Sequence, residues 1–164
     1  MVEGELTAGE RVLILGATGA SGRIAAQLAH GAGARVVVAG RNQRVLDRLV
    51  ERGAETAVRV DRPRDELAAA IAAAGPYDLV VDYLWGPPAE AAFAALERGG
   101  PGGRIRYVLV GMTAGPEAAL PAMALRRARV LLFGSGIGGE APLAAAAAAY
   151  DRVLASDRRV VFVP

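Results

Sequence analysis

A glycine-rich turn is the segment of this sequence whose residue types and spacing best fit a chemical role. It follows the apolar run RVLIL at residues 11–15 and consists of Gly16, Ala17, Thr18, Gly19, Ala20, Ser21 and Gly22. Ala17, Gly19 and Gly22 take the three small-residue positions of the pattern G-x-G-x-x-G, with Ala in place of the first glycine. Small residues there let phosphate groups reach the backbone N–H groups at the start of the following helix. We therefore expect this turn to bind the diphosphate of a dinucleotide; the alternative is a tight turn without a ligand.

The next corner between a strand and a helix indicates which dinucleotide fits. After the second apolar run the chain reads Arg41 and Asn42, and the first carboxylate is Asp47, already inside the predicted helix. Domains that prefer NAD carry an Asp or Glu at this corner, whereas an Arg accommodates the 2′-phosphate of NADP. We expect Arg41 to bind that phosphate, with Asn42 beside it and Arg44 assisting from one helical turn further on. The predicted cofactor is NADP(H); the alternative for Arg41 is a solvated side chain on a loop.

Further candidates follow the later apolar runs, because ligands of open parallel sheets lie at the carboxyl ends of the strands. Tyr83 and Trp85 would form an apolar wall near the nicotinamide end of the cofactor, although core packing is as strong an expectation for Trp85. Asp82 has no obvious partner, and we expect it to cap a loop. The candidate cofactor-binding residues in this group are Asp61, Tyr83, Trp85, Gly86, Gly111, Met112, Gly134 and Ser135.

The composition excludes several kinds of chemistry. The 164 residues carry a formal net charge of +2, which is too small to favour nucleic acid as a partner. No Cys is present, so thiol nucleophiles and Cys-ligated metals are excluded. All 19 basic residues are Arg, which excludes a Schiff-base or phosphate-binding lysine and any Tyr–Lys catalytic pair. His30 is the single histidine, so we expect no metal site, and no catalytic residue can be assigned.

Alternating apolar runs and helical stretches predict the elements that must position these residues. The fold class is α/β: a Rossmann, doubly wound, parallel six-stranded sheet of order 3-2-1-4-5-6 with helices on both faces. On the first helix we expect Ile24, Leu28 and small alanines to share one face. Strands are expected at 11–15, 35–39, 56–60, 78–82, 104–110 and 129–133, helices at 20–30, 42–52, 63–74, 87–98, 120–126 and 141–155, and a last strand at 158–163.

Several of these segments together resemble a known family. Residues 9–19 (GERVLILGATG), 78–86 (DLVVDYLWG), 107–111 (YVLVG) and 132–138 (LFGSGIG) are similar to the cofactor domain of medium-chain dehydrogenases/reductases, in particular its zinc-independent, quinone-oxidoreductase-like branch. Short-chain reductases share the GATGxxG turn, but their usual Tyr-x-x-x-Lys pair is impossible without lysine.

The resemblance implies an oxidoreductase that transfers hydride from NADPH to a quinone, an enone or a related carbonyl. It also implies a homodimer paired through the apolar sixth strand at the sheet edge, and a small-molecule substrate near the nicotinamide end. We expect residues 1–164 to form one dinucleotide-binding domain, without the N-terminal catalytic domain usual in the family. Alternatives are a stand-alone NADP(H)-binding module, sensor or pseudoenzyme, and a repurposed small enzyme.

The N-terminal residues and the apolar runs bear on where the protein acts. Residues 1–10 are acidic and lack the pattern of a secretory signal. No apolar run reaches the roughly 18 residues needed to span a bilayer. We therefore expect a cytoplasmic protein without a membrane or nucleic-acid partner.

Overall fold

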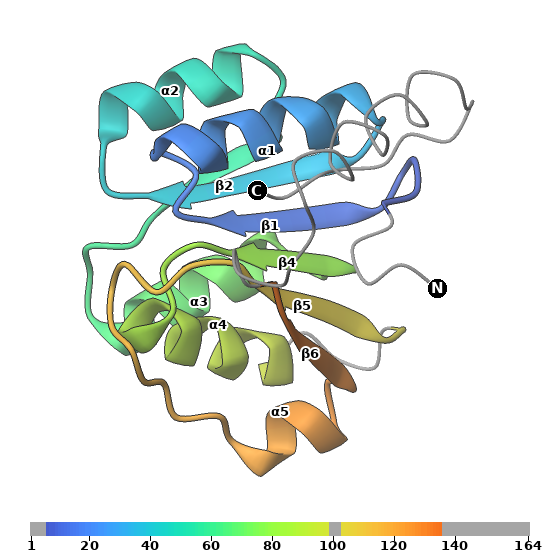
Figure 1. The fold of residues 1–164 in the computed structure, drawn as a ribbon, viewed down its shortest axis with the longest axis vertical. Coiled ribbons are helices and arrows are strands. Elements are labelled where there is room, and N and C mark those ends of the chain that lie inside the picture. The colour runs from blue at the N-terminus through green and yellow to red at the C-terminus, as the bar shows by residue number, and fades with distance from the viewer. Residues whose placement is uncertain (1–5, 99–102, 136–164) are drawn as a thin grey trace, which may run out of the picture.

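The six predicted apolar runs form one parallel sheet in the computed structural model, which describes residues 6–98 and 103–135. The order is β3-β2-β1-β4-β5-β6, and every neighbouring pair is parallel, so the predicted fold class is confirmed (Figure 1). These strands are apolar along their length because helices cover both faces of the sheet. Their bounds are β1 Arg11–Leu15, β2 Arg35–Gly40, β3 Thr56–Arg59, β4 Leu79–Asp82, β5 Ile105–Leu109 and β6 Val130–Gly134.

Two helical layers enclose the sheet (Figure 1). One contains α1 (Ala20–Gly31) and α2 (Gln43–Glu51), and the other contains α3 (Arg64–Ala74), α4 (Gly86–Arg98) and α5 (Ala122–Arg126). Each layer has its own buried hydrophobic cluster against the sheet. Because β2 and β4 flank β1 on opposite sides, successive connections diverge there and open a crevice at the carboxyl ends of these strands.

β6 lies at one edge of the sheet, as predicted. Its Leu131 and Leu132 are exposed, so the strand has apolar side chains available for pairing. The homodimer through this edge stays a prediction. The helix expected at 141–155 and the strand expected at 158–163 lie outside the described residues. Among the helices that are described, none is long and apolar enough to cross a membrane.

The packing of α1 corrects one expectation. Ile24 and Leu28 are 52% and 44% exposed while the alanines are buried, so the prediction that they share one face was wrong. The buried side of α1 consists of smaller residues: Gly22, Ala25, Ala26 and Ala29. The reason is distance, because a Cβ atom built on Gly22 would lie 2.3 Å from the carbonyl oxygen of Gly16. A helix this close to the sheet leaves no space beneath it for branched side chains.

The close contact at Gly22 can be tested with two matched substitutions in α1. We expect Gly22→Ala to lower the free energy of unfolding by about 1–3 kcal/mol, because the added methyl group overlaps the Gly16 backbone. Gly31→Ala is the control, since nothing lies within 4 Å of its added Cβ and Ala is the better helix former by up to about 1 kcal/mol. Urea unfolding measures both. Equal stability of the two variants would contradict the tight packing.

Candidate functional site

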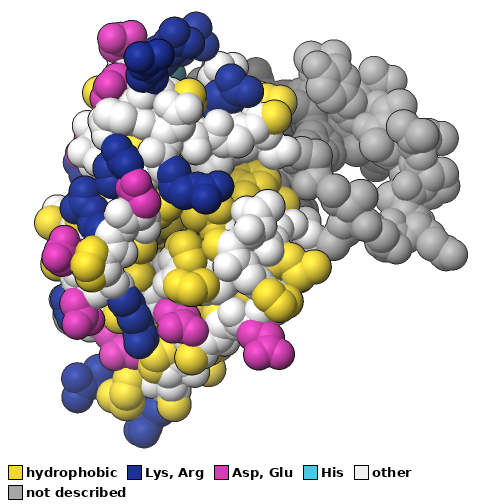
Figure 2. Space-filling view, turned by 90° about the vertical axis from the view of Figure 1, so that its left-hand side faces the viewer, with side chains coloured by type: hydrophobic (Ala, Val, Ile, Leu, Met, Phe, Trp, Pro, Cys, Tyr) yellow, Lys and Arg dark blue, Asp and Glu magenta, His cyan; other side chains and the backbone are white. Residues whose placement is uncertain are grey.

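The carboxyl ends of β1, β2 and β4 surround a pocket of about 570 Å³, a size within the range of small-molecule sites. Figure 2 faces this edge of the sheet and shows a hydrophobic hollow with charged side chains around its margin. Ten predicted cofactor-binding residues line the pocket: Gly16, Thr18, Gly19, Ala20, Ser21, Gly22, Arg41, Asn42, Tyr83 and Gly111. Four lining residues were not predicted: Gly40, Val60, Leu84 and Thr113.

The turn between β1 and α1 forms one wall of the pocket. The backbone N–H groups of Gly16 and Ala17 both donate to the Ala39 carbonyl oxygen at 2.9 Å, which ties the turn to the end of β2. The Gly19 N–H donates to Gly16 O at 3.0 Å and closes the turn. Ala17 is fully buried beneath it, so this predicted residue supports the turn without lining the pocket.

The first turn of α1 supplies hydrogen-bond donors to the same wall. Gly19 is the N-cap and provides no side-chain acceptor, and no acidic residue lies in the first turn. The backbone N–H groups at a helix start have no acceptor within the helix, and the helix dipole favours an anion there. Ala20, Ser21 and Gly22 therefore present polar backbone toward a lined space, as binding of a phosphate requires.

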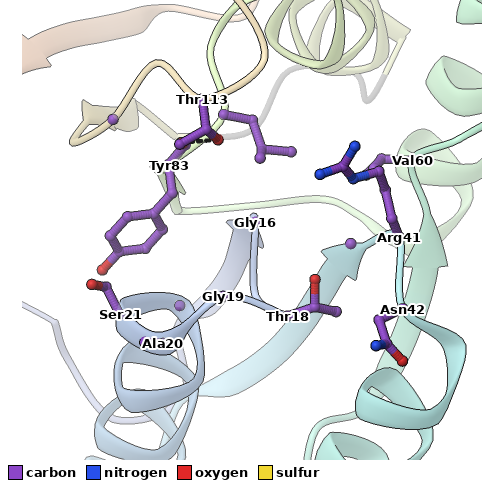
Figure 3. A pocket seen from close by; sticks show the side chains of 14 residues that line it. Gly16, Thr18, Gly19, Ala20, Ser21, Arg41, Asn42, Val60, Tyr83 and Thr113 are labelled. Carbon is purple, nitrogen blue, oxygen red and sulfur yellow. Dashed lines mark hydrogen bonds between the residues drawn. The ribbon is translucent and has the colours of Figure 1, made fainter.

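The corner after β2 forms the opposite end of the pocket. Gly40 lines the pocket and lies against Thr18. A Cβ atom built on Gly40 would lie 2.4 Å from the Thr18 methyl group, so a side chain larger than that of glycine does not fit there without displacing Thr18. Arg41 is exposed, and Figure 3 shows its guanidinium near Val60, across the pocket from Tyr83. Asn42 caps α2, since its Oδ1 accepts from the Val45 N–H at 3.2 Å, so its side chain already has a structural role.

Two other predicted residues of this corner lie outside the lining. Arg44 is exposed on α2 and is not a lining residue. Asp61 forms an ion pair with Arg59, whose Nε donates to Asp61 Oδ1 at 2.7 Å. This hydrogen bond lowers the pKa of Asp61. Val60, the residue before Asp61, lines the pocket in its place.

Asp82 organises the loop after β4. Its carboxylate is fully buried; Oδ1 accepts from the N–H groups of Leu84 at 2.7 Å and Trp85 at 3.0 Å, and Oδ2 accepts from the Tyr107 hydroxyl at 2.7 Å. Burial raises the pKa of Asp82, while hydrogen bonds from Trp85, Tyr107 and Leu84 act in the opposite direction. The expectation that Asp82 caps a loop agrees with these contacts.

Trp85 is partly buried and packs against the hydrophobic core. Its ring makes edge-to-face contacts with Phe93 and Tyr107, at centroid distances of 5.9 and 6.4 Å, and it does not line the pocket. Its position therefore agrees with the expectation of core packing rather than with that of an apolar wall in the pocket. Its backbone φ is +54°, an unusual value for a bulky residue, and Asp82 stabilises this conformation by accepting the Trp85 N–H.

The remaining candidates do not line the pocket. Gly86 begins α4, and Met112 is 65% exposed on the loop after β5. Gly134 ends β6, and Ser135 continues its pairing by donating its N–H to Leu109 O at 2.7 Å. Thr113 was missed although it follows the same strand as Gly111; its Oγ1 donates to the Tyr83 carbonyl oxygen at 3.0 Å, which brings two loops together.

The family follows from a comparison of the sequence with family models. The model described as zinc-binding dehydrogenase matches residues 20–152. The chain belongs to the zinc-binding dehydrogenase family. The matched part is the cofactor-binding domain of medium-chain dehydrogenases/reductases, as the resemblance implied. Within the ranges that the structure describes, no cluster of three or more His, Cys, Asp or Glu could hold a metal ion. The search of curated proteins gave no match.

Solved structures of similar fold include alcohol dehydrogenases and a quinone oxidoreductase. A putative alcohol dehydrogenase from Sinorhizobium meliloti 1021 is 29% identical with a TM-score of 0.67, over 92% of this chain and 38% of its own. The quinone oxidoreductase from Thermus thermophilus, also solved in complex with NADPH, is 29% identical with a TM-score of 0.66, over 91% and 44%. The cobalt- and zinc-bound alcohol dehydrogenase from Pyrobaculum aerophilum is 27% identical with a TM-score of 0.66, over 97% and 43%. The chain thus spans less than half of each of these proteins.

The buried Asp82 carboxylate predicts a pH dependence of stability. A raised folded-state pKa means that Asp82 takes up a proton more readily in the folded chain than in the unfolded chain. The contribution of this protonation to stability is complete below a pH of about 3.8 and is lost as pH rises through the folded-state pKa. Asp82→Asn cannot ionise. We expect the free energy of unfolding of the wild type, minus that of Asp82→Asn, to increase as pH falls from 7 toward about 4.

Asp61 provides a control of opposite sign, since Arg59 lowers its pKa. The corresponding difference for Asp61→Asn should decrease over the same pH range. Urea unfolding at several pH values measures both differences. A flat or decreasing difference for Asp82→Asn would contradict the raised pKa.

Proposed function

We propose that this chain binds NADP(H) in the pocket at the carboxyl ends of β1, β2 and β4, as the cofactor-binding part of an oxidoreductase. The β1–α1 turn carries the proposal, because backbone donors at the start of α1 line a pocket of suitable size. Membership in the zinc-binding dehydrogenase family and the likeness to a quinone oxidoreductase solved with NADPH support it.

The preference for NADP(H) over NAD(H) rests on Arg41. It lines the pocket at the corner after β2 and forms no ion pair with any other described residue. The carboxylate nearest in sequence, Asp47, accepts from the Gln43 side chain at 2.7 Å. A free guanidinium can bind a 2′-phosphate with two parallel hydrogen bonds, and no acidic residue lines the pocket to repel it.

The proposed reaction is hydride transfer from NADPH to a quinone, an enone or a related carbonyl compound. The cofactor supplies the hydride chemistry when it is bound. The chain's own residues hold the diphosphate at α1 and the 2′-phosphate at Arg41. The substrate would approach on the side of Tyr83 and Thr113, which line the pocket away from Arg41 (Figure 3).

Calorimetric titration with NADPH and, separately, NADH tests the cofactor assignment. We expect NADPH to bind more tightly, and Arg41→Ala to weaken NADPH binding roughly ten- to a hundredfold, as loss of a hydrogen bond between charged groups does. NADH binding should stay unchanged. Arg44→Ala is the matched control, since Arg44 lies on α2 outside the lining. Tighter binding of NADH by the wild type, or equal losses for both cofactors in Arg41→Ala, would contradict the preference.

A steady-state assay with NADPH and a small quinone tests the reaction itself. We expect NADPH oxidation above the enzyme-free rate, and in Arg41→Ala a raised KM for NADPH with nearly unchanged kcat, because Arg41 lies away from the reacting groups. Binding of NADPH without turnover would contradict hydride transfer by this chain. It would favour the second candidate, a cofactor-binding module, whose supporting observation is that no carboxylate and no histidine lines the pocket among the described residues.

A further inference from the structure

Tyr83 has a buried hydroxyl oxygen without a hydrogen-bond partner among the described residues. Two other buried side-chain atoms share this condition, Nε of Arg11 and Oε1 of Glu97, but neither residue lines the cofactor pocket. A buried hydroxyl left without a partner is destabilising by roughly 1–3 kcal/mol, so native structures rarely retain one without a reason. The position of Tyr83 in the pocket lining suggests that a ligand completes this hydrogen bond.

The backbone around Tyr83 fixes where its side chain can point. Its N–H donates to Leu15 O at 3.0 Å, and its carbonyl oxygen accepts from Thr113 Oγ1 at 3.0 Å. Asp82 holds the two residues that follow, through the N–H groups of Leu84 and Trp85. Figure 3 shows the resulting orientation: the Tyr83 ring extends from the end of β4 in the direction of the start of α1.

The environment of that hydroxyl suits an anionic acceptor. The first turn of α1 provides the positive end of a helix dipole, and the lining contains no carboxylate. Burial raises the pKa of Tyr83 to about 12, so the hydroxyl keeps its proton at neutral pH and can donate. A neutral donor also adds no charge that would have to be desolvated in the pocket.

We propose that the Tyr83 hydroxyl donates a hydrogen bond to a phosphate oxygen of the dinucleotide's diphosphate, completing the donor set that α1 begins. This inference rests on the proposed NADP(H) site and assigns a diphosphate-binding residue on the β4 side, opposite the turn. In a chain without lysine, the residues that recognise phosphate then divide into two groups. Tyr83 and the α1 backbone bind the diphosphate, while Arg41 binds the 2′-phosphate.

Three ligands separate these roles by calorimetric titration of the full chain: NADPH, ADP and adenosine 2′-monophosphate. ADP has a diphosphate but no 2′-phosphate, whereas adenosine 2′-monophosphate has a 2′-phosphate but no diphosphate. We expect Tyr83→Phe to weaken NADPH and ADP binding by the same factor, roughly tenfold, and to leave adenosine 2′-monophosphate unchanged. Arg41→Ala should do the opposite, weakening NADPH and adenosine 2′-monophosphate but not ADP.

Tyr77→Phe is the matched control for stability. The Tyr77 hydroxyl is buried and donates to Ile71 O at 2.7 Å, in the hydrophobic cluster of α3 and α4, away from the pocket. Removing it should lower the thermal unfolding temperature without changing any of the three affinities. Tyr83→Phe should show the reverse pattern, with an unfolding temperature equal to or above that of the wild type, because the hydroxyl it removes has no partner among the described residues.

The titrations separate failure of the proposed NADP(H) site from failure of the role assigned to Tyr83. Wild-type protein that binds neither NADPH nor ADP contradicts the proposed function itself. Wild-type binding with unchanged affinities in Tyr83→Phe contradicts only the role of Tyr83. Weaker binding of NADPH with unchanged ADP binding also overturns the diphosphate assignment, because Tyr83 would then contact the nicotinamide half of the cofactor or its ribose.

Discussion

The distance between the start of α1 and the end of β1 is the constraint on which the rest of the site depends. Gly22 lies so close to Gly16 that no side chain fits between them. This contact places the first turn of α1 directly above the carboxyl end of the sheet, where its backbone N–H groups line the pocket. It also limits the buried face of α1 to Gly and Ala. The close contact between Gly22 and Gly16 therefore determines both the position of the backbone donors in the pocket and the small size of the residues buried beneath α1.

A second organising contact is the buried carboxylate of Asp82. A buried charge is costly unless hydrogen bonds satisfy it, and here two backbone N–H groups and the Tyr107 hydroxyl do so. The same contacts fix the loop that follows β4, including the unusual backbone of Trp85. Because Thr113 then bonds to the carbonyl of Tyr83, the loops after β4 and β5 form one wall. The hydrogen bonds that offset the cost of burying Asp82 thus also fix the loop on one side of the pocket.

The sequence predicted what depends on local pattern and failed where tertiary contacts decide. Strand order and the tight turn between β1 and α1 follow from apolar runs and glycine spacing, and both could be predicted. The ion pair between Asp61 and Arg59 could not be predicted, because the sequence does not show whether an exposed carboxylate contacts solvent, a ligand or a neighbouring side chain. Ile24 and Leu28 were misplaced because hydrophobic periodicity assumes that large residues face the core, whereas the short distance at Gly22 reverses that preference. Leu84 and Thr113 follow β4 and β5, at the ends where ligands of such sheets lie, but the sequence could not separate them from Trp85 and Met112, which do not line the pocket.

The two ends of the pocket differ in rigidity, and this difference bears on affinity and selectivity. At the α1 end the backbone donors and Tyr83 are fixed before any ligand arrives, so little conformational entropy is lost on binding. At the other end Arg41 is exposed on a long side chain with many rotamers, and ordering it opposes the attraction to a phosphate. The fixed end should therefore contribute most of the affinity for any dinucleotide. In the proposed NADP(H) site, Arg41 would then act mainly on the choice between dinucleotides, because its ordering is compensated only when a 2′-phosphate is present.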